Sequence, residues 1–366
     1  MLTKNSLFIS LLTISSLTSL GYAEVKTKSP KSSEKQETKK ADHGLYSESQ
    51  LKGKFVSWGI DPNYKTSSIN LEPTWKKFKK NKDIVVAVID TGIQHNHPFL
   101  KDNIFVINGK AGNSNYGMDF SGKSASPTPT DSHGHGTHVS GIIKSIFPEV
   151  KLLSLKYYNP QASGQKNLES TIQALKYAVD NNVDIINYSG GGPEASAAEL
   201  SILKQAEEKG ILVIAAAGNE KSNIDLKKNA YYPASYGLSN IVTVGAHDEY
   251  NQVISSSNWG RKSVDIAAPG YRIKSAIPGS GAGLMTGTSQ ATAFVTGVAA
   301  LIKSKFPKLN FQQVKNIILS SSLKVSKLKG KVLGGGKLDA LRAIEVAEHV
   351  NTKLFGLKRT VAKKNN

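Results

Sequence analysis

The chain has 366 residues, 39% of them hydrophobic, which is enough to build one large α/β domain or two ordinary domains. It contains no cysteine, and this excludes disulfide bonds, thiolate metal sites and a cysteine nucleophile. The 47 Lys and Arg residues exceed the 28 Asp and Glu residues, giving a formal net charge of +19 and raising the question of an anionic partner.

Much of the positive charge lies in lysine-rich stretches at residues 24–44, 76–82 and 353–366. These stretches lack the interleaved aromatic residues on which nucleic-acid bases stack. We therefore expect no nucleic-acid partner, and we interpret the charge as an aid to solubility and a source of attraction to anionic surfaces.

The first 23 residues have the order typical of a secretory signal: Lys4, an apolar stretch over residues 7–20, and small residues up to Ala23. A membrane anchor is the alternative, but the apolar stretch is shorter than the roughly 20 residues that span a bilayer. The sequence thus predicts export with cleavage after Ala23 and no stable membrane insertion afterwards. It leaves open whether the destination is periplasmic or extracellular.

Residues 24–52 are rich in Lys, Ser and Glu and lack aliphatic periodicity, so we expect a disordered leader or linker. Globular patterning begins at residue 53. The predicted domain covers residues 53–352, and a basic tail follows at residues 353–366.

Within the domain, apolar runs alternate with helical patterns. The runs that predict buried parallel strands are residues 84–89, 150–155, 183–189, 211–218 and 241–246. The predicted helices are residues 136–147, 168–182, 197–210, 288–306, 311–322 and 337–350, with Gly210 as a C-terminal cap. This order predicts a single doubly wound α/β domain with a mostly parallel sheet flanked by helices.

Three polar residues stand where such a fold places its chemistry. Asp90 ends the first strand, His135 lies between glycines at the start of a predicted helix, and Ser289 lies at the start of the apolar helix. Serine acyl transfer needs a hydroxyl, an imidazole that accepts its proton and a carboxylate that orients the imidazole. The side-chain amide of Asn219 and the backbone N–H of Ser289 could stabilise the negative charge that develops on the attacked carbonyl oxygen.

The segments around these four residues resemble the subtilase family of subtilisin-like serine proteases. They read VAVIDTGI around Asp90, HGTHVSG around His135, AAAGNE around Asn219 and GTSQATAFVTGVAAL around Ser289. The similarity covers most of residues 57–345 and keeps the family's chain order of Asp, His and Ser. Each short motif is weak alone, but four in the right order are specific.

The resemblance implies a catalytic triad of Asp90, His135 and Ser289, an oxyanion hole formed by Asn219 and the Ser289 N–H, and no required cofactor. It also implies that the polypeptide substrate binds as an extended strand. The substrate-binding residues implied in this way are Ser163, Gly164, Ser189, Gly190, Gly191, Ala216, Ala217, Gly218 and Tyr231.

Three departures from the family pattern have consequences. Family members commonly have leucine at the Gly190 position and a small residue at the Tyr231 position, so we expect the primary side-chain pocket to lack one apolar wall and to be shallow. Many also have a calcium-ligating aspartate where this chain has Phe99. A phenyl ring cannot coordinate a hard cation, so that calcium site is predicted to be absent.

The predicted function is that of a monomeric, exported serine endopeptidase. A peptide ligase or cyclase that uses the same acyl-enzyme, and a non-catalytic peptide-binding protein on a protease scaffold, remain alternatives. Any single Asp, His or Ser beside glycine is usually a cap or a turn, and only the ordered set favours catalysis. His138 is interpreted as structural, and the histidines near it show no recognised zinc spacing.

Overall fold

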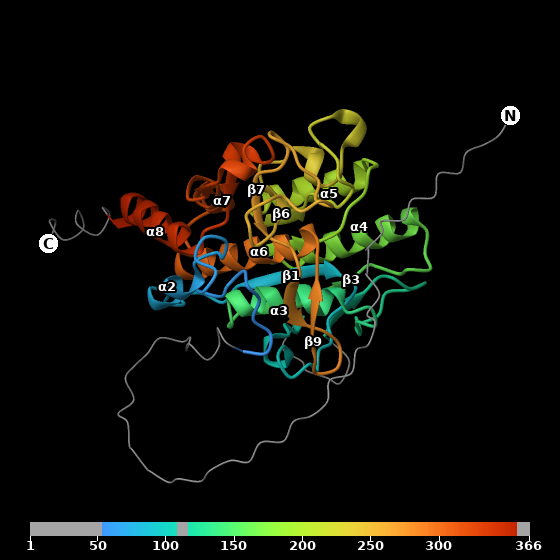
Figure 1. The fold of residues 1–366 in the computed structure, drawn as a ribbon. Helices are drawn as coiled ribbons and strands as arrows, with labels where there is room; N and C mark the ends of the chain where they lie inside the picture. Colours follow the sequence, from blue (N-terminus) through green and yellow to red (C-terminus); the bar gives the residue numbers. More distant parts are fainter. Residues whose placement is uncertain (1–52, 108–115, 357–366) are drawn as a thin grey trace, which may run out of the picture.

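The computed structural model describes residues 53–107 and 116–356 (Figure 1). The predicted signal peptide, the predicted leader and most of the predicted basic tail therefore lie outside the described residues. Within those residues, no helix is both long enough and apolar enough to cross a membrane.

A nine-stranded sheet forms the centre of the domain, in the order β10-β11-β7-β6-β5-β4-β1-β3-β2. All neighbours pair in parallel except β10 and β11. Its strands are β1 (Val85–Asp90), β2 (Gly117–Asp119), β3 (Lys151–Lys156), β4 (Ile185–Tyr188), β5 (Leu212–Ala216), β6 (Ile241–His247), β7 (Ile266–Pro269), β10 (Leu323–Lys324) and β11 (Gly336–Lys337). A separate antiparallel hairpin joins β8 (Ile273–Ala276) to β9 (Ala282–Met285).

Helices cover both faces of the sheet. They are α2 (Leu71–Lys76), α3 (His135–Ile146), α4 (Gly164–Asp180), α5 (Ala197–Glu208), α6 (Thr288–Lys305), α7 (Phe311–Ser320) and α8 (Ala340–Asn351). Short 3-10 turns and one π turn complete the described elements: η1 (Lys101–Asn103), η3 (Lys227–Asn229), η4 (Ala234–Tyr236), η5 (Ser326–Leu328), η6 (Leu333–Gly335) and η7 (Thr352–Gly356). The mostly parallel α/β sheet flanked by helices is the predicted fold class.

Two hydrophobic clusters fill the layers because successive strand side chains point to opposite faces. Val86 and Val88 of β1 pack in one cluster with residues of α3, α6, α7 and α8. Ala87 and Ile89 pack in the other with residues of α4 and α5. Figure 1 shows α3 and α6 near the middle of the molecule, with α7 and α8 at one end.

Helix α6 is buried on nearly all sides, which explains its apolar sequence. It crosses α3 closely at Gly297, where an added Cβ would lie 2.7 Å from Cβ of Ile146. The absence of a side chain at Gly297 thus lets the two helices approach. This packing fixes the N-terminal end of α6 at the edge of the sheet where β1, β4 and β5 end.

Two helices begin at residues other than those predicted from the sequence, and capping side chains explain the difference. Helix α4 begins at Gly164 rather than at residue 168, because the Ser163 hydroxyl accepts the backbone N–H of Lys166 at 3.2 Å. Helix α8 begins at Ala340 rather than at residue 337, because Asp339 caps it and the preceding residues form β11. Gly210 has a left-handed φ of 76° and follows Lys209, the C-cap of α5, at the position where helices commonly end on glycine.

Candidate active site

Asp90 and His135 meet at the carboxyl edge of the sheet. Asp90 ends β1, His135 is the first residue of α3, and Oδ1 of Asp90 lies 2.7 Å from Nδ1 of His135. The two residues are only 3% and 4% exposed. Gly136 is required next to them, because a Cβ there would lie 2.1 Å from the backbone oxygen of Gly92. The carboxylate is thus placed to fix the orientation of the ring.

Two opposing effects set the pKa of His135. Burial of the ring disfavours its charged form, while the negative charge and hydrogen bond of Asp90, with a smaller contribution from Asp131, favour it. The favourable interactions prevail, and the pKa of His135 lies above its usual value of 6.5. A ring that charges readily beside a carboxylate is suited to accept a proton during a reaction.

Asp131, which no sequence motif indicated, holds the turn that presents His135. Its Oδ1 accepts hydrogen bonds from the Thr91 hydroxyl at 2.9 Å, the Gly134 N–H at 2.7 Å and the His133 N–H at 3.1 Å. Its Oδ2 accepts the Thr137 N–H at 2.9 Å and the Thr137 hydroxyl at 2.6 Å. The buried carboxylate therefore ties the β1 end to the start of α3.

Ser289 is the second residue of α6 and is 5% exposed. Its hydroxyl donates to the backbone oxygen of Ser189 at 2.9 Å, and Ser189 directly follows β4. Nε2 of His135 is buried and has no hydrogen-bond partner. In this structure the Ser289 hydroxyl is therefore bonded to Ser189 and not to His135.

Asn219 follows β5 and reaches the start of α6, where its Oδ1 accepts the Thr288 N–H at 3.0 Å. This bond holds the side-chain amide of Asn219 at the start of α6, where a Cβ added at Gly287 would lie 3.5 Å from its Nδ2. The loop itself is held by Asn258, whose Oδ1 accepts the N–H groups of Glu220 at 3.0 Å and Ser222 at 2.9 Å. Because β5, β4 and β1 are neighbours, Asn219, Ser189 and Asp90 come to one edge.

Tyr231 lies between the two segments expected to border the primary side-chain pocket. A Cβ added at Gly191 would lie 2.5 Å from its ring, and a Cβ added at Gly218 would lie 3.0 Å from it. At Gly190 an added Cβ would lie 2.4 Å from the Tyr157 hydroxyl. The buried Tyr231 and the partly buried Tyr157 thus occupy the space around these glycines, and the part played by Tyr157 was not visible in the sequence.

The remaining residues expected to bind substrate lie around the same edge. Ala216 ends β5, and Ala217 and Gly218 lead on to Asn219. Ser163 and Gly164 stand at the exposed start of α4, where the Ser163 side chain serves as a helix cap. Their contact with substrate remains a prediction.

The environment of Phe99 differs from that of a cation ligand. Its ring stacks on Phe55 with centroids 4.4 Å apart, and its backbone oxygen accepts a hydrogen bond from the Lys144 ammonium. The positive charge of Lys144 at this carbonyl does not suit a calcium ion. In residues 53–107 and 116–356, no three His, Asp or Glu side chains are grouped to hold a metal.

His138 has the contacts of a structural residue. Its Nε2 lies 2.9 Å from the backbone oxygen of Ile273 in β8, and burial lowers its pKa to about 4. It therefore remains neutral and joins α3 to the β8–β9 hairpin.

Comparison with known proteins places this site in a family. The model of the subtilase family, Peptidase_S8, matches residues 81–349. The chain is 36% identical over 248 residues to the major intracellular serine protease of Bacillus subtilis (strain 168), covering 65% of this chain and 74% of that protein. It is 36% identical to subtilisin E of the same organism over 66% of this chain, and it spans 60% of the length of subtilisin E.

A solved structure from work on the assembly of the subtilase cytotoxin SubAB is also similar, with a TM-score of 0.67 and 27% identity. The match covers 80% of this chain and 98% of the other. The family match extends over far more than half of the chain and includes all four segments from which the resemblance was drawn. The chain therefore belongs to the subtilase family and is a subtilisin-like serine endopeptidase.

Proposed function

We propose that the protein is an exported endopeptidase that hydrolyses extended polypeptides through an acyl-enzyme on Ser289. The observation that supports this most directly is the buried 2.7 Å bond between His135 and Asp90 at the sheet edge, beside the start of α6. Export is supported by the order of charge, apolar stretch and small residues in the first 23 positions.

In the proposed reaction, His135 accepts the proton of the Ser289 hydroxyl while Ser289 attacks the scissile carbonyl. Asp90 keeps the imidazole in the required tautomer and stabilises its charged form. His135 then gives the proton to the leaving amine, and water, deprotonated in turn by His135, hydrolyses the acyl-enzyme. The released Ser189 carbonyl remains next to the site, where it can accept an N–H of the extended substrate.

The Asn219 amide and the backbone N–H of Ser289 supply the donors for the tetrahedral oxyanion. Because Thr288 and Asn258 hold Asn219 and its loop in place, little rearrangement is needed when the charge develops. The loss of one such donor typically lowers kcat by about 10² to 10³.

The test uses the protein lacking residues 1–23 and its Ser289→Ala variant. Both are treated with a serine-directed fluorophosphonate probe, and cleavage of unfolded casein is followed in parallel. We expect the wild type to be labelled and active, and the folded variant to be neither. Equal casein cleavage by both proteins would show that Ser289 is not the nucleophile. Product masses separate hydrolysis, which adds water, from ligation.

We also propose that the primary pocket accepts only small side chains, because Tyr231 and Tyr157 occupy the space beside Gly190, Gly191 and Gly218. Peptides with Ala at the residue that supplies the scissile carbonyl should be cleaved in preference to peptides with Phe. Tyr231→Gly should raise the Phe-to-Ala ratio of kcat/KM by at least about tenfold, since pocket volume discriminates between side chains on this scale.

The matched control is Tyr250→Gly, which makes the same change at a side chain that is 65% exposed. Its Phe-to-Ala ratio should equal that of the wild type. The same ratio in all three proteins, with each one folded, would place the selective pocket elsewhere.

A further inference from the structure

A cavity outside the candidate active site lies at the β10–β11 end of the sheet. It has a volume of about 640 Å³ and is lined by the turn at Arg261–Lys262 and by residues from Lys324 to Gly335. These segments surround β10 and β11, at the edge of the sheet, whereas Asp90, Ser189 and Asn219 follow β1, β4 and β5. No residue of the proposed triad lines it, so this cavity is distinct from the peptidase site.

All the charged residues that line this cavity are positive. Arg261, Lys262, Lys324 and Lys329 line the cavity, and no Asp or Glu does. None of these four cations forms a salt bridge with the described residues. The nearby Asp225 accepts the backbone N–H groups of Lys262 and Ser263 rather than an ammonium group. The positive charges are therefore not neutralised within the cavity.

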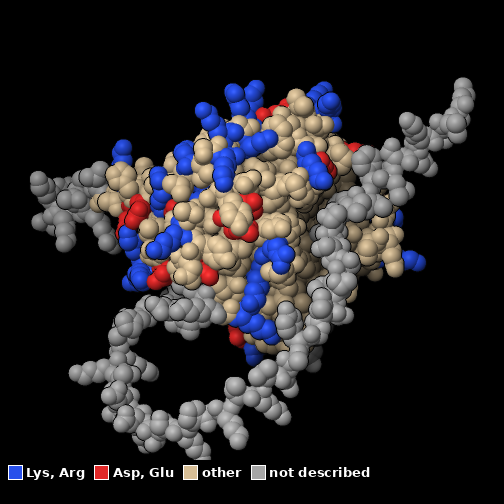
Figure 2. All heavy atoms as spheres, viewed as in Figure 1, with Lys and Arg blue, Asp and Glu red and all other residues tan. Residues whose placement is uncertain are grey.

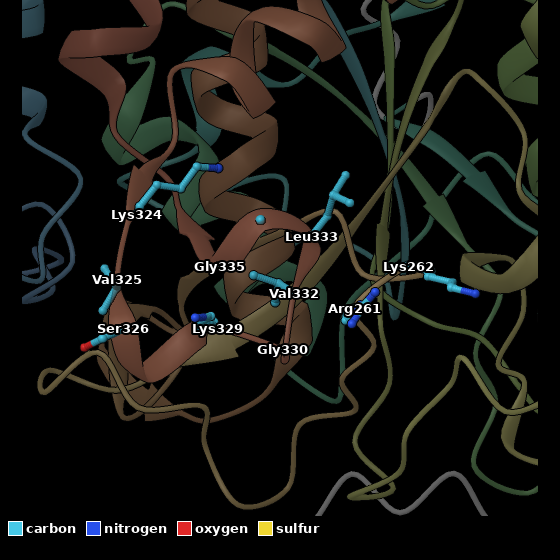
Figure 3. Close-up of a pocket in the computed structure, with 11 residues that line it drawn as sticks. Arg261, Lys262, Lys324, Val325, Ser326, Lys329, Gly330, Val332, Leu333 and Gly335 are labelled. Carbon is cyan, nitrogen blue, oxygen red and sulfur yellow. The ribbon is translucent and has the colours of Figure 1, made fainter.

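The shape of the lining keeps these charges apart and accessible. Figure 3 shows Lys324 and Lys329 on one side of the turn that holds Gly330 and Gly335, and Arg261 and Lys262 on the other. All four side chains are exposed. In the wider surface of Figure 2, Lys and Arg outnumber Asp and Glu over the part that holds β7 and α7. Cations at several points of one concave surface favour a ligand with several negative charges.

One glycine allows this arrangement on the Lys324 side. Gly334 has a left-handed φ of 63°, and a Cβ added there would lie 2.8 Å from the Lys324 ammonium. The ammonium also donates to the Ser322 hydroxyl at 3.2 Å. Lys324 is thus held over the glycine turn by a neutral partner, with its charge facing the cavity.

We propose that this basic cavity, defined by Arg261, Lys262, Lys324 and Lys329, binds a polyanion that bears clustered phosphate groups. Phosphate concentrates up to two charges on one tetrahedral group. It accepts both the planar fork of arginine and the point charge of lysine, the two kinds of donor present. The volume is that of a small-molecule site and has room for more than one phosphate group.

The experiment is a calorimetric titration of tripolyphosphate into the chain lacking residues 1–23 and carrying Ser289→Ala, which prevents self-cleavage. The cavity variant is Lys324→Gln with Lys329→Gln. The control is Lys101→Gln with Lys204→Gln, which removes the same charge from exposed side chains outside the cavity. We expect one site per chain, weakening of at least about tenfold in the cavity variant, and a change below about twofold in the control.

Long-chain polyphosphate is titrated as well, because the comparison distinguishes a small soluble phosphate ligand from a phosphate polymer. Tight binding of tripolyphosphate indicates a small soluble ligand, whereas tight binding of the long chain alone indicates a phosphate polymer. Equal weakening in the two double variants would show diffuse surface attraction and overturn the proposal. So would the absence of binding, or equally tight binding of polyglutamate, which would point to an acidic peptide.

Discussion

At the scale of single residues, the protein's chemistry depends on how buried charges are compensated. His135 is buried but stays easy to protonate because Asp90 lies 2.7 Å away. Asp131 is buried but accepts five hydrogen bonds, all from the segments that meet at the site. The role of each group can therefore be tested by replacing the residues that stabilise its buried charge.

The pH dependence of activity should follow His135. The base must be neutral to accept a proton, and its pKa is raised above 6.5, so kcat/KM should increase with pH and reach half its maximum above pH 6.5. Asp90→Asn should lower kcat by about 10³ to 10⁴ and shift this midpoint to lower pH, since burial of the ring is then opposed only by the smaller contribution of Asp131. A wild-type midpoint below 6.5 would mean that burial outweighs Asp90.

Asp131→Ala should lower the free energy of unfolding by about 2–4 kcal/mol, because buried donors in the turn before α3 lose their acceptor. Urea unfolding in the Ser289→Ala background measures this without self-digestion. Asp180→Ala is the control: its carboxylate is half exposed and pairs with Lys176, so its loss should cost less than about 1 kcal/mol. Equal losses in the two variants would argue against a structural role for Asp131.

The sequence alone indicated Asp90, His135, Ser289 and Asn219 because each lies in a motif whose spacing places it at a strand or helix end. It did not indicate Asp131 or Tyr157. An aspartate before a glycine-rich turn looks like any turn residue, and Tyr157 comes close to Gly190 only once β3 and β4 have packed beside β1. Such contacts depend on tertiary structure and have no local signature.

At the scale of elements, periodicity predicted the long buried strands and the helices α3 to α8, but not the six-residue α2, the four-residue β7 or the shorter strands. The strands β2, β10 and β11 have two or three residues, too few for a repeating pattern. The β8–β9 hairpin has strands of only four residues, and Leu284, the large apolar residue in the middle of β9, is 54% exposed, so neither strand has the long buried run seen in the main sheet. Helix starts were missed where a capping side chain, rather than an apolar residue, begins the helix.

The crossing of α3 and α6 gives a prediction at this scale. Gly297→Ala should lower the free energy of unfolding by about 1–3 kcal/mol, because the new Cβ would lie 2.7 Å from Cβ of Ile146 and push the helices apart. The higher helix propensity of Ala alone would instead raise the free energy of unfolding by about 1 kcal/mol. Ser201→Ala, on the exposed side of α5, reports propensity without a clash. A stabilised Gly297→Ala variant, measured by urea unfolding, would contradict the close crossing.

At the scale of the whole molecule, buried neutral histidines make the fold sensitive to acid. Burial lowers the pKa of His138 to about 4 and, with the nearby charge of Lys337 adding to it, that of His247 to about 3. Their usual value is 6.5, so below that pH the unfolded chain binds protons that the folded chain does not. His135 acts in the opposite direction, since its pKa is raised.

The free energy of unfolding should therefore fall as the pH drops from about 6.5 towards 4. The slope of the unfolding free energy against pH gives the number of protons taken up on unfolding, and His247→Gln should reduce that number by up to one. Urea titrations of the Ser289→Ala protein at several pH values measure the slope, with His349→Gln on the outer part of α8 as a control. An unchanged slope in His247→Gln would show that His247 is already protonated in the folded state.

The order of the strands has a consequence for the time at which activity appears. Asp90 and His135 are 45 residues apart in the chain, and Ser289 and Ser189 are 100 residues apart. They meet only after β1 has been inserted between β3 and β4 and α6 has docked on the sheet. Such non-local pairing forms slowly. If the proposed mechanism holds, a chain in which α6 has not yet docked contains Asp90, His135 and Ser289 but does not bring them together, so it should cut no peptide, itself included.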